Sequence, residues 1–210
     1  MIVSVVIPAY NEEPRIARTV EAAQAHADQV VVVDDGSTDG TADVARRAGA
    51  MVVSQANAGY IAAIKRGFRE ASGDVVVTLD ADGEHRAEDI PRLLGPIRED
   101  RADLVLGQRP WIPRPSERFL NWLANLRAPV GDSGTGFRAL RRDLALDLEL
   151  KGRCICGISV LEPLARGARV AHVPVHLEAI DKPRRMAWYH LAQVWYVLRW
   201  LLGPARKELG

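Results

Sequence analysis

Two aspartates separated by one residue end a strand-forming run in VTLDADGEH, residues 77–85. Asp80 and Asp82 would repel each other unless a positive charge lies between them. Their carboxylates, with that of Glu84 close behind, are hard oxygen ligands that suit Mg²⁺ or Mn²⁺ held together with substrate phosphates. A solvated acidic turn that caps the next helix is the alternative. These three carboxylates are our candidate metal site.

Two more polar clusters follow apolar, β-branched runs. IVSVVIP, residues 2–8, leads into AYNEE, and QVVVVDDG leads through Asp34 and Asp35 to Ser37. Apolar strands that alternate with helical patterns up to residue 107 predict an α/β fold with a mostly parallel central sheet flanked by helices. Because ligands of such sheets bind outside the carboxyl ends of the strands, we expect the three clusters at one sheet edge.

Apolar periodicity and cap residues indicate the other elements. Helices are expected from about Pro14, from candidate caps at residues 37–39 to about Gly49, and at residues 60–71, 88–99, 116–127 and 157–166. Strands are expected at residues 51–54, 74–80, 103–107 and 169–177, and GDSGTGFRALRR is expected to enter an extended segment. We predict one domain, residues 1–180, and a C-terminal helical appendage, residues 181–210.

The predicted C-terminal helix, AWYHLAQVWYVLRWLL, mixes aromatic side chains with cations. Such a mixture suits a membrane interface, where aromatic rings lie at headgroup level. The segment is too short to span a bilayer comfortably. The alternative is a helix packed on the domain itself or on a second subunit.

Bulk composition limits the classes of partner and compartment. The 210 residues carry a net charge of +1, which gives no reason to expect a nucleic-acid partner. The N-terminus begins a strand without a signal-peptide n-region, and no apolar run approaches ~20 residues, so we expect a cytoplasmic protein that is peripheral on the cytosolic membrane face. Cys154 and Cys156 form a C-x-C pair without matching Cys or His partners, which is a poor zinc site. We expect buried or inert thiols in a reducing compartment.

The motifs together resemble a known family. VVIPAYNEE, VVVDDGSTDGT, the NAG of residues 57–59, GDVVVTLDADGEH and DSGTGFR are similar, in that order, to the inverting family 2 glycosyltransferases, which have a GT-A fold. The resemblance spans roughly residues 2–178. Within that family, the chain most resembles dolichyl-phosphate mannose synthases and other polyprenyl-phosphate glycosyltransferases.

The resemblance implies roles for the matching residues. Asp82, Asp132 and Arg138 would be catalytic, and Asp80, Asp82 and Glu84 would hold Mg²⁺ or Mn²⁺. Acceptor-phosphate contacts are implied for Arg109 and Arg138. Where the synthases carry an Arg-Gly-Ser-Lys segment, this chain has EAIDKPRRMAW, in which Lys182 and Arg184 are the candidate cations. Nucleotide-sugar contacts are implied for Pro8, Ala9, Tyr10, Glu12, Asp35, Asp80, Ala81 and Asp82.

The implied activity is metal-dependent, inverting transfer of a sugar from a GDP- or UDP-sugar to an acceptor. The acceptor that the resemblance favours is polyprenyl phosphate. A phosphate acceptor is already anionic at neutral pH, because its second pKa is ~6. A soluble or saccharide hydroxyl acceptor is the alternative and needs a general base, for which Asp132 is the first candidate and Glu162 the second. A non-catalytic nucleotide-binding or scaffold protein is the alternative of another class. The nucleotide base, the sugar and the oligomeric state stay open.

Overall fold

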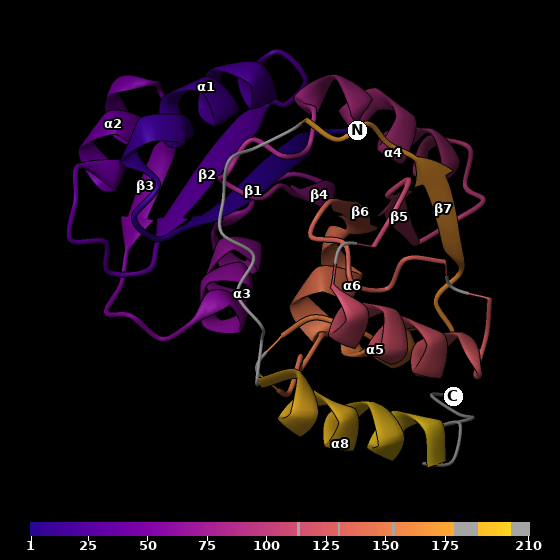
Figure 1. Cartoon of the computed structure of the whole chain (residues 1–210). Helices are drawn as coiled ribbons and strands as arrows, with labels where there is room; N and C mark the ends of the chain where they lie inside the picture. Colours follow the sequence, from indigo (N-terminus) through magenta and orange to yellow (C-terminus); the bar gives the residue numbers. More distant parts are fainter. Residues whose placement is uncertain (113, 130, 153, 179–188, 203–210) are drawn as a thin grey trace.

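The protein folds around one seven-stranded sheet, which a computed structural model describes within residues 1–112, 114–129, 131–152, 154–178 and 189–202 (Figure 1). Its strands are β1 (Val3–Ala9), β2 (Gln29–Asp34), β3 (Met51–Ser54), β4 (Val75–Thr78), β5 (Leu104–Gln108), β6 (Arg138–Arg141) and β7 (Val170–Pro174). The strand order is β3-β2-β1-β4-β6-β5-β7, and β6 alone among these strands runs antiparallel to its neighbours. The predicted mostly parallel sheet is confirmed.

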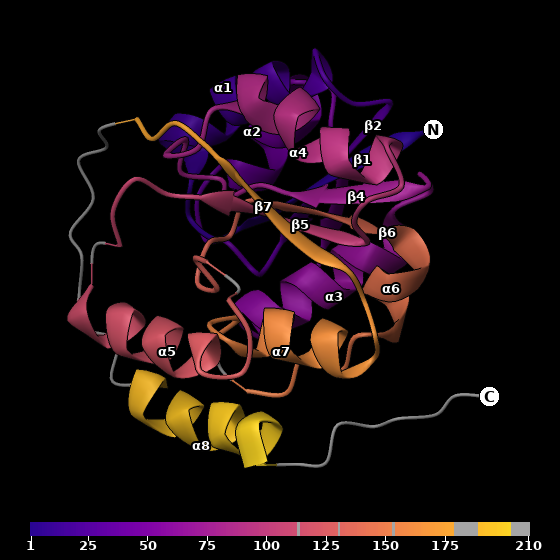
Figure 2. The same ribbon diagram turned by 90° about the vertical axis from the view of Figure 1, so that its right-hand side faces the viewer.

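Helices cover both faces of the sheet (Figures 1 and 2). One face carries α1 (Glu13–Gln24), α2 (Thr41–Arg47), the 3₁₀ turn η1 (Ala87–Asp89) and α4 (Ile90–Arg98). The other carries α3 (Tyr60–Glu70), α5 (Pro115–Asn125), α6 (Arg142–Asp147) and α7 (Ile158–Ala165), with α8 (Tyr189–Leu202) outside them. Two hydrophobic cores therefore lie on either side of the sheet.

The side-chain alternation of a strand explains why both faces are covered. In β1, Val5 and Ile7 belong to the core under α1 and α4, whereas Val6 belongs to the core under α3. Helix α3 approaches β1 closely at Gly67, where an added Cβ would come 2.1 Å from Val6 Cγ1. A glycine inside this helix is therefore a packing requirement rather than a helix break.

Strand β6 brings DSGTGFR beside the D-x-D turn, because β6 lies between β4 and β5. Arg138 pairs in register with Thr78, and Thr78 Oγ1 donates to Gly136 O at 2.6 Å. The predicted extended segment is thus confirmed as β6. Helix α6, which begins at Arg142 immediately afterwards, is a finding that the sequence did not predict.

The residues expected to cap α2 have different partners. Gly40 is the N-cap residue, and only Asp39 of the three candidates bonds the first turn, accepting from the Thr41 N–H at 3.0 Å. Ser37 and Thr38 instead contact Asn11, through the Asn11 N–H and side-chain oxygen respectively. These two bonds tie the loop after β1 to the loop after β2.

Helix α8 packs on the domain, against α5 and α7 (Figure 2). Val197 is fully buried in this contact, while Trp195 is 74% exposed. Packing on the domain, the alternative considered for this helix, is therefore confirmed for its buried side, and membrane contact stays a prediction. None of the helices in the described part of the chain combines the length and apolar character needed to cross a bilayer.

Candidate active site

The D-x-D turn lies at the carboxyl end of β4, with Asp80 and Asp82 both half-buried. Asp80 Oδ1 accepts a hydrogen bond from the Tyr60 hydroxyl at 3.0 Å, and Asp82 Oδ1 accepts one from the Glu84 N–H at 3.1 Å. Gly136 leaves room for the Asp80 carboxylate, since an added Cβ there would stand 2.2 Å from Asp80 Oδ2. Three carboxylates on one turn are a donor set that fits Mg²⁺ or Mn²⁺.

Tyr60 and Arg138 support Asp80 from the α3 side of the sheet. Burial, followed by the charge of Asp80, raises the pKa of Tyr60 well above its ordinary value, so its hydroxyl stays a neutral donor. Arg138 is only 4% exposed and donates from Nη2 to the Thr135 carbonyl. Burial lowers the pKa of Arg138, and the neighbouring Tyr60 and Asp80 oppose that shift. The predicted acceptor contact of Arg138 would therefore have to be made by a buried guanidinium.

The residues predicted to contact the nucleotide lie at the ends of β1 and β2. Pro8 and Ala9 are buried and pair in register with Val33 and Asp34. The next residue, Tyr10, is 49% exposed. The structure therefore brings the first two polar clusters to the sheet edge that also holds the D-x-D turn, as predicted from the strand pattern.

Two of the predicted nucleotide contacts are occupied within the protein. The Asp35 carboxylate is buried and accepts from Gln55 Nε2 at 2.7 Å and from the Ala58 and Gly59 N–H groups at 2.9 and 2.8 Å. Glu12 is also buried, and its carboxylate accepts from Arg15 Nη1 at 3.4 Å. Asp35 thus fixes the loop that ends at Tyr60, the donor to Asp80, and so couples two of the polar clusters.

A buried ion-pair network contains two of the predicted site residues, Arg109 and Asp132. Arg109 donates to both Asp132 oxygens, at 2.5 and 3.1 Å, and to Glu117 Oε2 at 3.3 Å. Burial alone would lower the pKa of Arg109, but the hydrogen bonds and charges of Asp132 and Glu117 raise it above its ordinary value. Asp132 is 0% exposed and also accepts from the Gly134 N–H. In this geometry both side chains are held in a buried ion pair, and the phosphate contact of Arg109 and the base role of Asp132 stay predictions.

The second candidate base, Glu162, is also hydrogen-bonded and ion-paired within the protein. Glu162 is 0% exposed and accepts from the N–H groups of Glu149 and Leu150, at 2.6 and 3.0 Å, and from Arg166 at 3.0 Å. It is therefore a paired carboxylate that holds the segment before α7. The candidate cations Lys182 and Arg184 lie outside the described residues.

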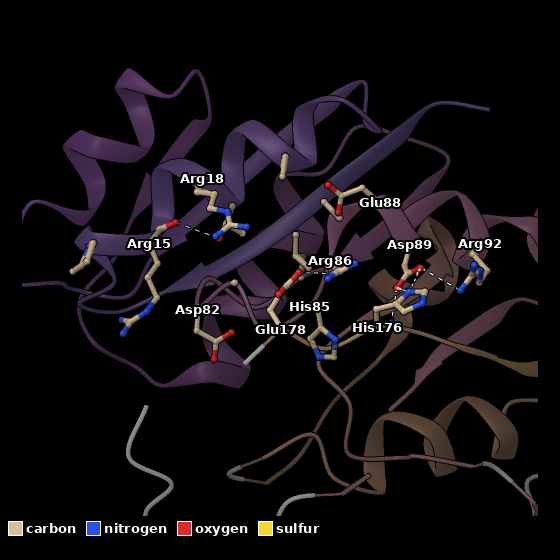
Figure 3. A pocket seen from close by; sticks show the side chains of 16 residues that line it. Arg15, Arg18, Asp82, His85, Arg86, Glu88, Asp89, Arg92, His176 and Glu178 are labelled. Carbon is tan, nitrogen blue, oxygen red and sulfur yellow. Dashed lines mark hydrogen bonds and ion pairs between the residues drawn. The ribbon is translucent and has the colours of Figure 1, made fainter. Parts of the chain in front are cut away.

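A cleft of about 780 Å³ opens beside the D-x-D turn, between α1 and the start of α4 (Figure 3). Among the predicted site residues, it is lined by Asp82 alone within the described part of the chain. Its cations Arg15, Arg18, Arg86 and Arg92 suit an anionic ligand, although Arg15 is paired with Glu12, Arg86 with Glu178 and Arg92 with Asp89. None of these arginines was among the predicted site residues. The sequence signal for them was a pair of arginines, Arg15 and Arg18, three residues apart at the start of α1.

His85, which also lines the cleft, is buried and contacts the Phe137 ring, with 5.1 Å between ring centroids. Burial, helped by the charge of Arg109, lowers its pKa to about 4. Its Nδ1 is buried with no hydrogen-bond partner among the described residues. The imidazole is therefore neutral at pH 7 in the metal-free protein.

The depressed pKa of His85 predicts an acid-sensitive stability. Between about pH 6.5 and 4 the unfolded chain binds a proton that the folded chain does not, so stability falls as the pH falls through this window. In EDTA, the wild type is expected to lose about 3 kcal/mol more than His85→Leu between pH 7.5 and 4. Denaturant unfolding of both proteins at both pH values measures the two losses of stability. The other histidines are common to both proteins, so their contributions cancel from the comparison. Equal losses in the two proteins would contradict the prediction.

Comparison with known proteins places this geometry in a family. The model for glycosyl transferase family 2 matches residues 4–146. An uncharacterized glycosyltransferase of Mycobacterium tuberculosis (strain ATCC 25618 / H37Rv) is 36% identical over 192 residues, covering 87% of this chain and 86% of the relative. The undecaprenyl-phosphate 4-deoxy-4-formamido-L-arabinose transferase of Serratia proteamaculans (strain 568) is 35% identical over 68% of this chain. That match covers 49% of the transferase, so this chain spans about half its length.

Solved structures share the fold. A crystal structure of glucosyl-3-phosphoglycerate synthase from Mycobacterium tuberculosis, in complex with Mn²⁺, UDP-glucose and phosphoglyceric acid, has a TM-score of 0.80 and 25% sequence identity. The match covers 97% of this chain and 79% of the synthase. The GT-A fold expected from the motifs is therefore confirmed. With its family model, its relatives and its fold in agreement, this chain belongs to glycosyltransferase family 2 and is a glycosyltransferase.

Proposed function

We propose that the enzyme transfers a sugar, with inversion, from a nucleotide-diphosphate sugar to polyprenyl phosphate, using Mg²⁺ or Mn²⁺. The observation that carries the proposal is the D-x-D turn at the sheet edge, where Asp80, Asp82 and Glu84 sit beside the loops that follow β1 and β2. A UDP-sugar donor is supported by the related synthase, which was crystallised with Mn²⁺ and UDP-glucose. The nucleotide would lie along Pro8–Glu12, Asp35 and Ala81.

In this proposal Asp80, Asp82 and Glu84 hold the divalent ion, which supplies positive charge to the diphosphate leaving group. Tyr60 orients the Asp80 carboxylate through its 3.0 Å hydrogen bond, and Gly136 keeps the space beneath it open. Arg138 adds a buried positive charge next to Asp80. Such preorganised groups stabilise developing charge without having to move during the reaction.

The state of the candidate bases supports a phosphate acceptor over a hydroxyl. Asp132 and Glu162 are both buried and ion-paired, so neither is placed to remove a proton. A phosphate monoester needs no base, because its oxygen is already anionic near neutral pH. In a single displacement, that oxygen forms the new bond to the anomeric carbon as the bond to the diphosphate breaks, and the diphosphate leaves with the electron pair.

The surface of α5 and α8 supports a lipid acceptor. On α5, Phe119 and Trp122 are 50% and 56% exposed and lie with ring centroids 5.8 Å apart. On α8, which packs against α5, Trp195 is 74% exposed. One exposed arginine accompanies these rings on each helix, Arg118 on α5 and Arg199 on α8. Exposed aromatic rings mixed with cations favour peripheral contact with a membrane interface, where a polyprenyl phosphate would be presented.

A soluble phosphorylated acceptor is the second candidate, because the related synthase structure holds phosphoglyceric acid. A donor screen followed by an acceptor pair separates the two. Stabilisation by one nucleotide sugar with Mn²⁺ is expected, by about 2.7 kcal/mol at a hundredfold excess over Kd, and EDTA should abolish it.

With the donor identified, radiolabelled sugar should transfer to undecaprenyl phosphate in vesicles and not to phosphoglyceric acid. The reverse pattern would select the soluble acceptor. No stabilisation and no transfer with GDP- or UDP-sugars would overturn the proposed function.

A further inference from the structure

A second cluster of ligand atoms lies away from the D-x-D turn. Cys154 and Cys156 precede α7, and His190 lies in the first turn of α8. All three side chains are buried, and their ligand atoms lie within 4.8 Å of one another. Cys156 Sγ and His190 Nε2 are 3.9 Å apart. The C-x-C pair was a poor zinc site by sequence because it lacked a third ligand, and the fold supplies one from 34 residues downstream.

The imidazole of His190 is oriented by a neighbour in the way that metal-binding histidines are. Its Nδ1 lies 2.7 Å from the Ser116 hydroxyl on α5, while Nε2 faces Cys156. In the tautomer that donates Nδ1–H to Ser116, the Nε2 lone pair points toward the thiols. A polar partner on the far ring nitrogen fixes the tautomer and ring orientation of metal-ligating histidines.

The same side of α8 clamps the C-x-C loop with a second polar side chain. Gln193 is fully buried, accepts from the Cys154 N–H at 3.3 Å and donates to the Cys156 carbonyl at 3.4 Å. Residues 190, 193 and 197 share one helical face, and Val197 packs apolarly beneath Gly157. Both buried polar residues of this face, His190 and Gln193, are hydrogen-bonded to neighbouring segments, so the contact between α8 and the C-x-C loop is polar as well as apolar.

We propose that Cys154, Cys156 and His190 bind one Zn²⁺ that joins α8 to the catalytic domain. Two sulfurs and one imidazole match the ligand preference of zinc. Tetrahedral Zn–S and Zn–N bonds place neighbouring ligand atoms about 3.6–3.8 Å apart, close to the 3.9 Å between Cys156 Sγ and His190 Nε2. The site is distinct from the D-x-D turn, whose oxygen ligands suit a harder ion.

The location gives the ion a structural role next to the DSGTG loop. Cys156 Sγ lies 3.7 Å from the position of a Cβ on Gly134, which also neighbours Asp132 and Arg109. Zinc would therefore fix both the start of α8 and the wall behind the Arg109–Asp132 pair. The described residues supply three ligands, and we assign the fourth position of a tetrahedral site to water.

Metal analysis of the full chain, purified without a histidine tag or chelator, tests the site. Elemental analysis by mass spectrometry should find about one Zn²⁺ per chain, and Co²⁺ substitution should give a sulfur-to-cobalt charge-transfer band. Cys156→Ser and His190→Gln should lose both signals, while His26→Gln and Asp82→Asn should keep them. Ser116→Ala should bind zinc about 10–100-fold more weakly.

Two results would overturn the site. One is wild-type protein with no zinc and no charge-transfer band after Co²⁺ is added. The other is an intact mass that reveals a Cys154–Cys156 disulfide in freshly prepared protein. If Cys156→Ser does not fold, the wild type still decides, because bound Zn²⁺ should protect both thiols from alkylation until a chelator removes it. None of these readouts depends on transferase activity.

Discussion

Asp82→Asn is expected to lower kcat/KM for sugar transfer by about 10²–10³-fold, or ~3–4 kcal/mol of transition-state stabilisation. Asparagine keeps the size and one oxygen of the side chain but removes the negative charge that would hold the divalent ion. Asp82 Oδ1 also accepts the Glu84 N–H at 3.1 Å, and an amide oxygen can retain that bond. The loss should therefore arise from metal binding rather than from collapse of the turn.

Two measurements make this prediction specific. The Mn²⁺ concentration for half-maximal activity should rise in Asp82→Asn, since a weakened site needs more metal, while the unfolding free energy in EDTA should stay near the wild-type value. Asp43→Asn, the same chemical change on the exposed surface of α2, should alter neither quantity. Activity of Asp82→Asn within threefold of the wild type at limiting Mn²⁺ would remove this aspartate from the metal site.

The position of the candidate site could be predicted because the ends of the strands can be recognised in the sequence. Uninterrupted β-branched runs fixed the positions of β1, β2 and β4, and the rule for parallel sheets then placed Pro8, Asp34 and Asp80 at one edge. Neither step needed side-chain contacts. The antiparallel insertion of β6 was less visible, because a four-residue strand carries little periodicity, and its place depended on resemblance.

Residue roles were harder to read, because a side chain's type does not reveal its partner. Arg109 and Asp132 were each expected to face ligands, yet the chain folds so that these residues, 23 positions apart, face each other. Tyr60 was overlooked because it reads as an ordinary first residue of a helix. Its position next to the loop held by Asp35 gives it access to Asp80. Such roles depend on loop paths rather than on local pattern.

The largest stability effect is expected at the Arg109–Asp132 pair. Asp132→Asn leaves Arg109, which is 9% exposed and permanently charged, without its bidentate partner. Removing one member of a buried pair costs about 3–5 kcal/mol, and the remaining contact to Glu117 favours the lower end, about 3 kcal/mol. Chemical denaturation of the two proteins at pH 7 measures the difference. Asp43→Asn, at a surface pair with Arg46, should cost no more than about 1 kcal/mol.

A double-mutant cycle then distinguishes a structural pair from a catalytic base. If Asp132 acts by pairing with Arg109, adding Arg109→Met should restore part of the unfolding free energy lost in Asp132→Asn, because the unpaired charge is gone. The expected coupling energy is about 0.5–3 kcal/mol. A general base would behave differently. Asp132→Asn would abolish transfer while leaving the unfolding free energy unchanged, and the coupling energy between residues 109 and 132 would be near zero. That outcome would restore the hydroxyl-acceptor alternative, since a phosphate acceptor requires no base.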